Sequence, residues 1–167
     1  KCLWLPFGFE DAHITFPEEN EEIKRACFVG NPDSNRASVL MRLADTGLAI
    51  SLYGNQWEKW IKVKSNQDIQ FKGTIYKEQF NKELSPYRLH LNIFRPHNYD
   101  SHNMRTFEIP GLGGIMLAPE SKEHRLLFEH KKEVMLYNNF AELSKMAKEI
   151  LGLPYKEALE MRKNAYH

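Results

Sequence analysis

Two charged side chains in the stretch 89–118 have the spacing of a nucleotide-binding pair. Arg105 and Glu108 are three positions apart, so on a helix they would lie next to each other on one face. The planar fork of an arginine matches the geometry of phosphate. A glutamate accepts hydrogen bonds from a vicinal diol, as carboxylates do from ribose in dinucleotide sites. The pair therefore predicts a nucleotide site, and the alternative is a surface ion pair worth only ~0.2–0.5 kcal/mol.

A loop crowded with polar groups precedes this pair. We expect a buried strand over 89–94 that turns polar through Asn92, Arg95 and His97, as strands do when they deliver groups to a site. Ser101 is a good N-cap residue, so the helix is expected to begin behind it with free amides facing the loop. Free amides at the positive end of a helix dipole attract anions. The loop and the helix start together predict an anion seat.

The order of the other elements predicts where this seat lies. Strands are expected over 26–30, 48–53, 68–72, 89–94, 115–118 and 133–137, with helices between them. Strands that alternate with helices through short connections indicate an α/β fold, here a doubly wound (Rossmann-like), mainly parallel six-stranded sheet with helices on both faces. In the usual order of such a sheet, ligands bind between the first and fourth strands, beyond their carboxyl ends. Gly30 and Asn31 follow the first of these strands and the polar loop follows the fourth, so both are expected at the ligand.

Length and composition exclude several classes of protein. A chain of 167 residues suits one well-buried domain, and its formal charge of +1 offers no electrostatic footprint for DNA or RNA. No apolar run approaches the ~20 residues that span a bilayer. Cys2 and Cys27 do not suggest a disulfide framework, which favours the cytoplasm. Because the chain starts with lysine and ends in a helical pattern, we expect it to be a fragment of a longer protein.

Other site chemistries fit the sequence less well. His97, Asp100 and His102 are residue types that bind metals, but they lack a recognisable ligand spacing, so no metal site is expected. The glycines of 111–114 follow a helix and precede a strand, which is the reverse of the order in a dinucleotide fingerprint. A GxxxxGK[ST] phosphate loop does not occur in the sequence. No cofactor is therefore expected besides a nucleotide substrate.

Several short motifs, taken in order, resemble GT-B glycosyltransferases, and among them most closely the CgeB-like group of the glycosyl transferases group 1 type. The motifs are FVGN…R (Phe28 to Arg36), ISLYGNQW, FKG, LNIFR, RTFEIPGLGG and LLFEHKKEVMLY. The resemblance implies that residues 25–167 are the C-terminal, nucleotide-sugar-binding half of a two-domain enzyme. Residues 1–24 would be an interdomain linker, in which the acidic run PEENEE is expected to be solvated. The partner would be the N-terminal, acceptor-binding domain of the same polypeptide.

The resemblance also implies roles for individual residues. In related enzymes two acidic residues stand eight positions apart; the second binds the ribose and matches Glu108, and the first contacts the donor sugar and matches Asp100, where glutamate is usual. These two and Arg105 are the predicted catalytic residues. The donor would be a nucleotide-diphosphate sugar bound without a metal, its leaving group stabilised by amides, a helix dipole and basic side chains. The residues predicted to bind it are Gly30, Asn31, Arg36, Asn92, Arg95, Ser101, His102, Asn103, Met104 and Gly113.

Three functions follow from these patterns. The leading one is the donor-binding domain of a glycosyltransferase whose acceptor is a glycan, a cell-surface polysaccharide or a protein. The departure at Asp100 keeps open a non-catalytic nucleotide-binding or assembly domain of the same fold. A different doubly wound enzyme, such as an epimerase, is disfavoured because the first loop, GNPDSNR, lacks a glycine fingerprint.

Overall fold

A parallel sheet organises the chain. The computed structural model describes residues 8, 14–98 and 100–167, and within these the six strands lie in the order β3-β2-β1-β4-β5-β6. The strands are β1 (Ile23–Val29), β2 (Ile50–Tyr53), β3 (Ile69–Gly73), β4 (Tyr87–Leu91), β5 (Ile115–Pro119) and β6 (Met135–Tyr137). All their pairings are parallel, so the predicted doubly wound sheet is confirmed. The strand order reverses between β1 and β4, as predicted.

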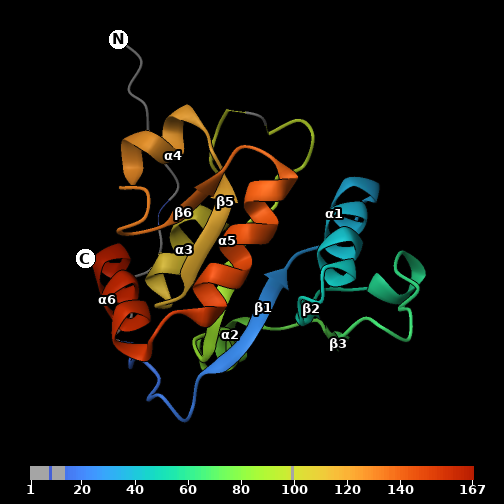
Figure 1. Cartoon of the computed structure of the whole chain (residues 1–167), viewed down its shortest axis with the longest axis horizontal. Helices are drawn as coiled ribbons and strands as arrows, with labels where there is room; N and C mark the ends of the chain where they lie inside the picture. Colours follow the sequence, from blue (N-terminus) through green and yellow to red (C-terminus); the bar gives the residue numbers. More distant parts are fainter. Residues whose placement is uncertain (1–7, 9–13, 99) are drawn as a thin grey trace.

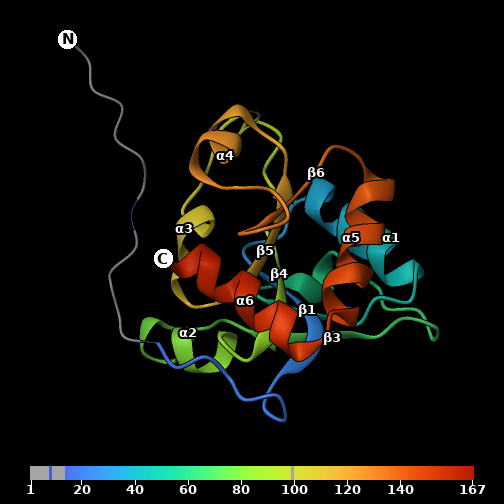
Figure 2. The ribbon, with the colours of Figure 1, turned by 60° about the vertical axis from the view of Figure 1, so that its left-hand side comes forward.

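Helices cover both faces of the sheet (Figures 1 and 2). The helical elements are α1 (Ser34–Asp45), the 3-10 turn η1 (Trp57–Lys59), α2 (Lys77–Leu84), α3 (Arg105–Gly111), α4 (Lys122–Leu127), α5 (Phe140–Gly152) and α6 (Tyr155–Tyr166). Side chains of a strand alternate between its two faces. Ala26 and Phe28 of β1 therefore share a core with α1 and α5, whereas Cys27 between them packs with residues of α2 and α3. Cys27 is a buried free thiol, and Cys2 lies outside the described residues.

Several predicted elements are present with different ends. β4 covers Tyr87–Leu91 rather than 89–94, and its earlier start includes Arg88, which is fully buried in the strand despite its charge. The segment expected to be a helix around Trp57 is a single 3-10 turn in which Trp57 is buried but Trp60 remains 48% exposed. Despite these differences β1 and β4 are neighbours at the reversal of the strand order, where the site is expected.

The segment before β1 packs against the domain. Phe16 meets Tyr166 edge-to-face, and the Tyr155 hydroxyl donates to the Pro17 carbonyl at 3.0 Å. The Glu22 carboxylate is fully buried and forms ion pairs with Arg88 of β4 and, at 3.1 Å, with Arg162 of α6. The expectation of a solvated acidic run is therefore wrong at Glu22, because two buried arginines compensate its charge. The proposed boundary between linker and domain remains a prediction.

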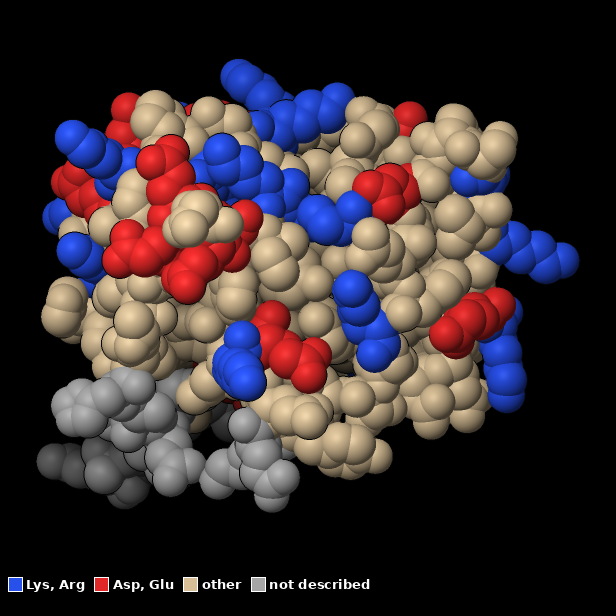
Figure 3. All heavy atoms as spheres, turned by 90° about the horizontal axis from the view of Figure 1, so that it is seen from below, with Lys and Arg blue, Asp and Glu red and all other residues tan. Residues whose placement is uncertain are grey.

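The surface carries charges of both signs. On the face drawn in Figure 3, basic and acidic side chains are interspersed rather than gathered in a patch of one sign. In the described part of the chain, every helix is too short or too polar to cross a membrane.

Candidate functional site

A pocket opens where the strand order reverses, beyond the carboxyl ends of β1 and β4. It has a volume of about 330 Å³ and is named here the arginine pocket. Its lining residues are Val29, Gly30, Arg36, Arg95, Asn98, Asn103, Met104, Arg105 and Glu108. Most of these are residues that the sequence predicted for the site. The location agrees with the general rule for ligands of doubly wound sheets.

Three arginines converge on the arginine pocket. Burial lowers the pKa of Arg36; Asp33 opposes this effect, while the positive charges of Arg95 and Arg105 lower the pKa further. The Arg36 guanidinium is thus close enough to the positive charges of Arg95 and Arg105 to be repelled by both. The Arg95 guanidinium forms no hydrogen bond or ion pair with any residue that the structure describes, and its side chain is exposed. The pocket therefore favours an anionic ligand, which would offset this repulsion.

Arg36 also joins the two loops that border the pocket. Its Nε donates to the Ile93 carbonyl at 3.0 Å, and its Nη1 donates to the Asn31 carbonyl at 3.2 Å. Its own amide donates to the Asp33 carboxylate, the N-cap of α1. Arg36 thus connects the loop after β1 with the loop after β4, and Asn31 takes part through its backbone.

The end of β2 fixes the backbone at Gly30. The Trp57 indole donates to the Gly30 carbonyl at 3.0 Å, and its ring packs edge-to-face on Phe28. Gly54 has φ +141°, and a Cβ there would lie 2.2 Å from the Gly30 oxygen. Only glycine therefore permits this approach. Sequence reasoning missed the bond between Trp57 and Gly30, although ISLYGNQW places Gly54 and Trp57 directly after a strand.

Arg105 and Glu108 lie side by side on α3, as their spacing predicted. Nη1 of Arg105 contacts the Glu108 carboxylate, and Nε donates to the Val29 carbonyl at 3.2 Å. The Arg105 guanidinium also lies 5.0 Å from the centre of the Phe80 ring. The two side chains are 29% and 17% exposed and both line the pocket, so the pair is more than a solvated surface contact.

The start of α3 differs from the prediction. Oδ1 of Asn103 accepts from the Thr106 amide, and Oγ1 of Thr106 accepts from the Asn103 amide, both at 3.2 Å. This reciprocal capping begins the seven-residue helix at Arg105, so the prediction that Ser101 caps it is wrong. The backbone amide of Asn103 therefore donates to Thr106 and is not free to bind an anion. The positive character of the site comes mainly from arginine side chains.

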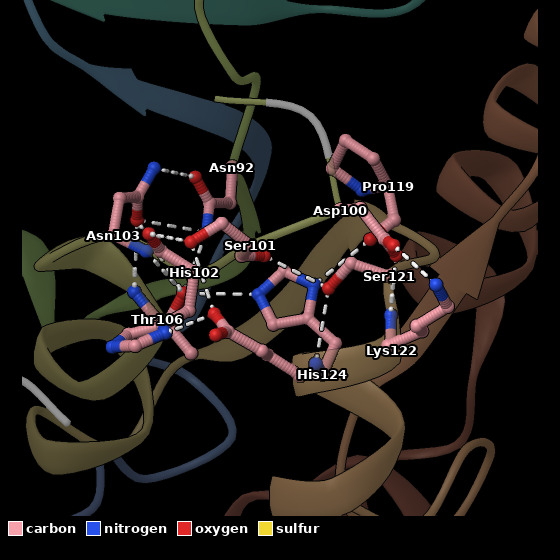
Figure 4. A network of polar contacts seen from close by, with 11 residues as sticks. Asn92, Asp100, Ser101, His102, Asn103, Thr106, Pro119, Ser121, Lys122 and His124 are labelled. Carbon is pink, nitrogen blue, oxygen red and sulfur yellow. Dashed lines mark hydrogen bonds and ion pairs between the residues drawn. The ribbon is translucent and has the colours of Figure 1, made fainter. Parts of the chain in front are cut away.

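A buried hydrogen-bond network ties β4, α3 and α4 together (Figure 4). The side chains of Asn92 and Asn103 exchange hydrogen bonds of 3.2 and 2.9 Å. Oγ1 of Thr106 lies 2.9 Å from Nε2 of His124, whose Nδ1 lies 2.8 Å from the Pro119 carbonyl. Because a carbonyl only accepts, Nδ1 of His124 is assigned as the donor and Nε2 as the acceptor. Burial lowers the pKa of His124, which agrees with a neutral ring.

Three predicted site residues contact α4 instead of lining the arginine pocket. Oδ1 of Asp100 accepts from the Lys122 amide and Oδ2 pairs with Lys122 Nζ, both at 3.0 Å, which lowers the pKa of Asp100. Ser101 Oγ donates to the Glu123 carboxylate at 2.9 Å, and Nδ1 of His102 contacts the same carboxylate. Asp100 lines a separate hollow together with residues of α4. Its contact with a donor sugar stays a prediction, as do the donor contacts of Ser101 and His102.

Gly113 lies at the opposite end of α3 from the pocket. Its φ is +75°, and its amide donates to the Pro110 carbonyl at 2.8 Å as the helix ends. A Cβ there would lie 2.8 Å from Cδ1 of Ile14. These contacts give Gly113 a structural role, and its predicted part in donor binding has no counterpart in the lining of the pocket. Among the described residues, no group of three His, Cys, Asp or Glu side chains is arranged to hold a metal ion.

Comparison with known families assigns the chain. The model of a family described as glycosyl transferase-like matches residues 36–167. The chain belongs to this family. No curated protein matches it at a significant level. The CgeB-like subgroup remains a prediction.

Solved GT-B glycosyltransferases share the fold. The β-glucosyltransferase of phage T4 bound to UDP-glucose has a TM-score of 0.71 and 23% identity, over 93% of this chain and 46% of that one. The same enzyme with UDP and Mn²⁺ gives 0.71 and 22%, over 93% and 45%. An α-glucosyltransferase with UDP and a 13-mer DNA containing an HMU base gives 0.63 and 11%, over 90% and 51%. The chain spans about half the length of these enzymes.

Proposed function

We propose that the arginine pocket binds the diphosphate of a nucleotide-sugar donor, and that the chain is the donor-binding domain of a glycosyltransferase. The observation that carries this proposal is the convergence of Arg36, Arg95 and Arg105 on a pocket in which Glu108 is the only carboxylate among the described lining residues. Membership of the glycosyl transferase-like family supports transferase chemistry. The UDP-glucose in the T4 enzyme supports a nucleotide sugar as the donor.

The pocket has separate groups for phosphate and for ribose. Arg95 and Arg105 present guanidinium groups to the diphosphate, and Glu108 lies one helical turn from Arg105, where it can accept from the ribose hydroxyls. Fixed positive charges are most effective where negative charge develops on a leaving diphosphate. Arg36 contributes to this charge and keeps the two bordering loops in register.

The rest of the enzyme is also part of the proposal. A second domain of the same polypeptide would bind the acceptor above the carboxyl edge of the sheet, with residues 1–24 as the connection. The coverage of about half of each solved glycosyltransferase supports such a partner domain. The acceptor would be chosen by that second domain, because the formal charge of +1 belongs to the donor half alone.

One observation favours a second candidate, a nucleotide-binding domain without transferase chemistry. The Asp100 carboxylate is held by Lys122, so the residue predicted to contact the donor sugar is not among the described residues that line the arginine pocket. Such a domain would bind UDP and UDP-glucose with equal affinity. A transferase domain would bind the complete donor more tightly, through added contacts with the sugar.

Calorimetric titration of the protein with UDP, GDP and UDP-glucose tests the proposal. We expect the protein to bind at least one of these three compounds. Arg95→Met should weaken that binding about 10- to 100-fold, the equivalent of one charge-assisted hydrogen bond. Arg125→Met is the matched control, because Arg125 forms an ion pair with Glu120 on the surface outside the arginine pocket. No heat at millimolar nucleotide, or equal weakening by both variants, would contradict the proposed site.

A further inference from the structure

Arg105 and Glu108 occupy each other with the groups that a nucleotide needs. Among the described residues, the partners of the Arg105 guanidinium are the Val29 carbonyl, the Phe80 ring and the Glu108 carboxylate. The Glu108 carboxylate has Arg105 as its hydrogen-bond partner. A phosphate bound by both outer nitrogens of Arg105 uses Nη1, which now contacts Glu108, and a diol bound by both carboxylate oxygens of Glu108 uses Oε2, which now contacts Arg105. The ion pair and the full set of ligand contacts therefore compete.

From this competition we infer that diphosphate binding frees Glu108 for the ribose. In this mechanism, which rests on the proposed function, phosphate draws the Arg105 fork away from Glu108, and the released carboxylate accepts from the two ribose hydroxyls. The ion pair thus acts as an internal latch that discriminates against nucleosides without phosphates. The substrate class it selects is nucleoside diphosphates and their sugars.

The contacts of Arg105 allow this exchange over a short path. The Nε bond to Val29 and the contact with Phe80 hold the base of the guanidinium, so only its outer nitrogens need to change partner. The side chain is 29% exposed, so water can solvate it during the exchange. Arg36 and Arg95 line the same pocket, and their positive charges draw phosphate to the place where Arg105 can reach it.

The latch makes binding of phosphate and of ribose mutually reinforcing. A nucleoside alone must break the ion pair before it can use Glu108, whereas a nucleoside diphosphate replaces the pair with a contact between arginine and phosphate. Linkage is reciprocal. Removal of Arg105 should therefore strengthen the binding of ribose by Glu108, and removal of Glu108 should strengthen the binding of phosphate by Arg105. We expect an effect of about tenfold in affinity, which corresponds to about 1.4 kcal/mol.

Two substitutions test the latch from opposite sides by calorimetry. Arg105→Met keeps an apolar side chain against Phe80 and frees Glu108. The Arg105→Met variant should bind uridine about tenfold more tightly than the wild type and UDP more weakly. If the wild type prefers GDP to UDP, guanosine and GDP are used as the probes. Glu108→Gln frees Arg105 and should tighten the binding of inorganic pyrophosphate about tenfold. Each variant is usable if its thermal unfolding remains cooperative, and either one suffices for the test.

A matched control separates the latch from a general effect of charge. Glu129 and Lys132 form an ion pair of the same i,i+3 spacing outside the arginine pocket, so Glu129→Gln and Lys132→Met should leave all three affinities unchanged. If Arg105→Met binds the nucleoside no more tightly than the wild type, or Glu108→Gln binds pyrophosphate no more tightly, the latch is wrong while the donor site stands. If the wild type binds neither UDP nor GDP, the proposed function itself fails.

Discussion

Replacement of Glu22 by glutamine tests how the segment before β1 is held to the domain. The Glu22 side chain is 0% exposed, and its partners Arg88 and Arg162 are 0% and 1% exposed. Burial lowers the pKa of Arg162 to about 10, although Glu22 acts to raise it. Removal of one partner from a buried ion pair costs ~3–5 kcal/mol, because the remaining charge is uncompensated. Glutamine keeps the size and one hydrogen-bond acceptor of Glu22, so we expect the free energy of unfolding to fall by about 3 kcal/mol, the lower end of this range.

Calorimetric unfolding measures this effect. For a chain of this size about 3 kcal/mol lowers the melting temperature by about 6–12 °C. Glu19→Gln is the control, because Glu19 is exposed in the same acidic run, and it should melt like the wild type. UDP affinity of Glu22→Gln well below its melting temperature should be unchanged, since Glu22 is absent from the lining of the arginine pocket. A melting temperature within about 2 °C of the wild type would refute the buried ion-pair cluster.

Three further predictions concern the support of the site and the dependence of stability on pH. Trp57→Phe keeps an aromatic ring against Phe28 but loses the indole bond to Gly30, so unfolding in urea should show a loss of about 1 kcal/mol and titration should show weaker UDP binding. Gly54→Ala places a Cβ 2.2 Å from the Gly30 oxygen and should cost about 3 kcal/mol, against about 1 kcal/mol for Gly47→Ala, where φ is also positive but no atom lies within 4 Å; equal costs would contradict the contact. Burial lowers the pKa of His90 to about 3, so its contribution to stability is complete above its unfolded pKa of about 6.5 and is lost as pH falls towards 3. Between pH 6.5 and 5, His90→Leu should remove a mean slope of about 1 kcal/mol per pH unit from the free energy of unfolding measured in urea, and an unchanged slope would contradict a neutral buried ring.

The sheet and the location of the arginine pocket were predictable because they depend on local patterns. Along the chain, short apolar runs alternate with segments whose apolar residues have helical spacing. That alternation alone favours a parallel doubly wound sheet whose crevice lies beyond its first and fourth strands. Gly30 and Arg95 follow those strands in the sequence and line the same pocket in the structure. The proximity of Arg105 and Glu108 followed from their helical spacing.

The details of the loop were not predictable because they depend on contacts distant in sequence. Ser101 and Asn103 are both suitable helix caps. In the structure the N-cap position is Met104, and the capping bond to the Thr106 amide comes from the side chain of Asn103, which also donates to Asn92 after β4. Asp100 keeps the expected spacing from Glu108, but the Lys122 amide at the start of α4 holds its carboxylate away from the pocket.

The contacts of Glu22 and Trp57 were also not predicted, because they form only when the folded chain buries these side chains. Glu22 stands in a run that reads as solvated, and only the fold brings Arg88 and Arg162 around it. Trp57 has the pattern of a core residue, and it is indeed buried, but its indole donor serves the backbone of a neighbouring loop. A single sequence does not identify the partner in either contact, because each partner depends on which strands are neighbours.

A crystal structure of the protein soaked or co-crystallised with UDP tests the central claim most directly. The account predicts the diphosphate within hydrogen-bond distance of Arg95 and Arg105, the ribose hydroxyls on the Glu108 carboxylate, and Arg105 separated from Glu108. UDP bound in the hollow beside Asp100 and Lys122, or an arginine pocket without nucleotide at a UDP concentration that saturates binding in solution, would contradict it.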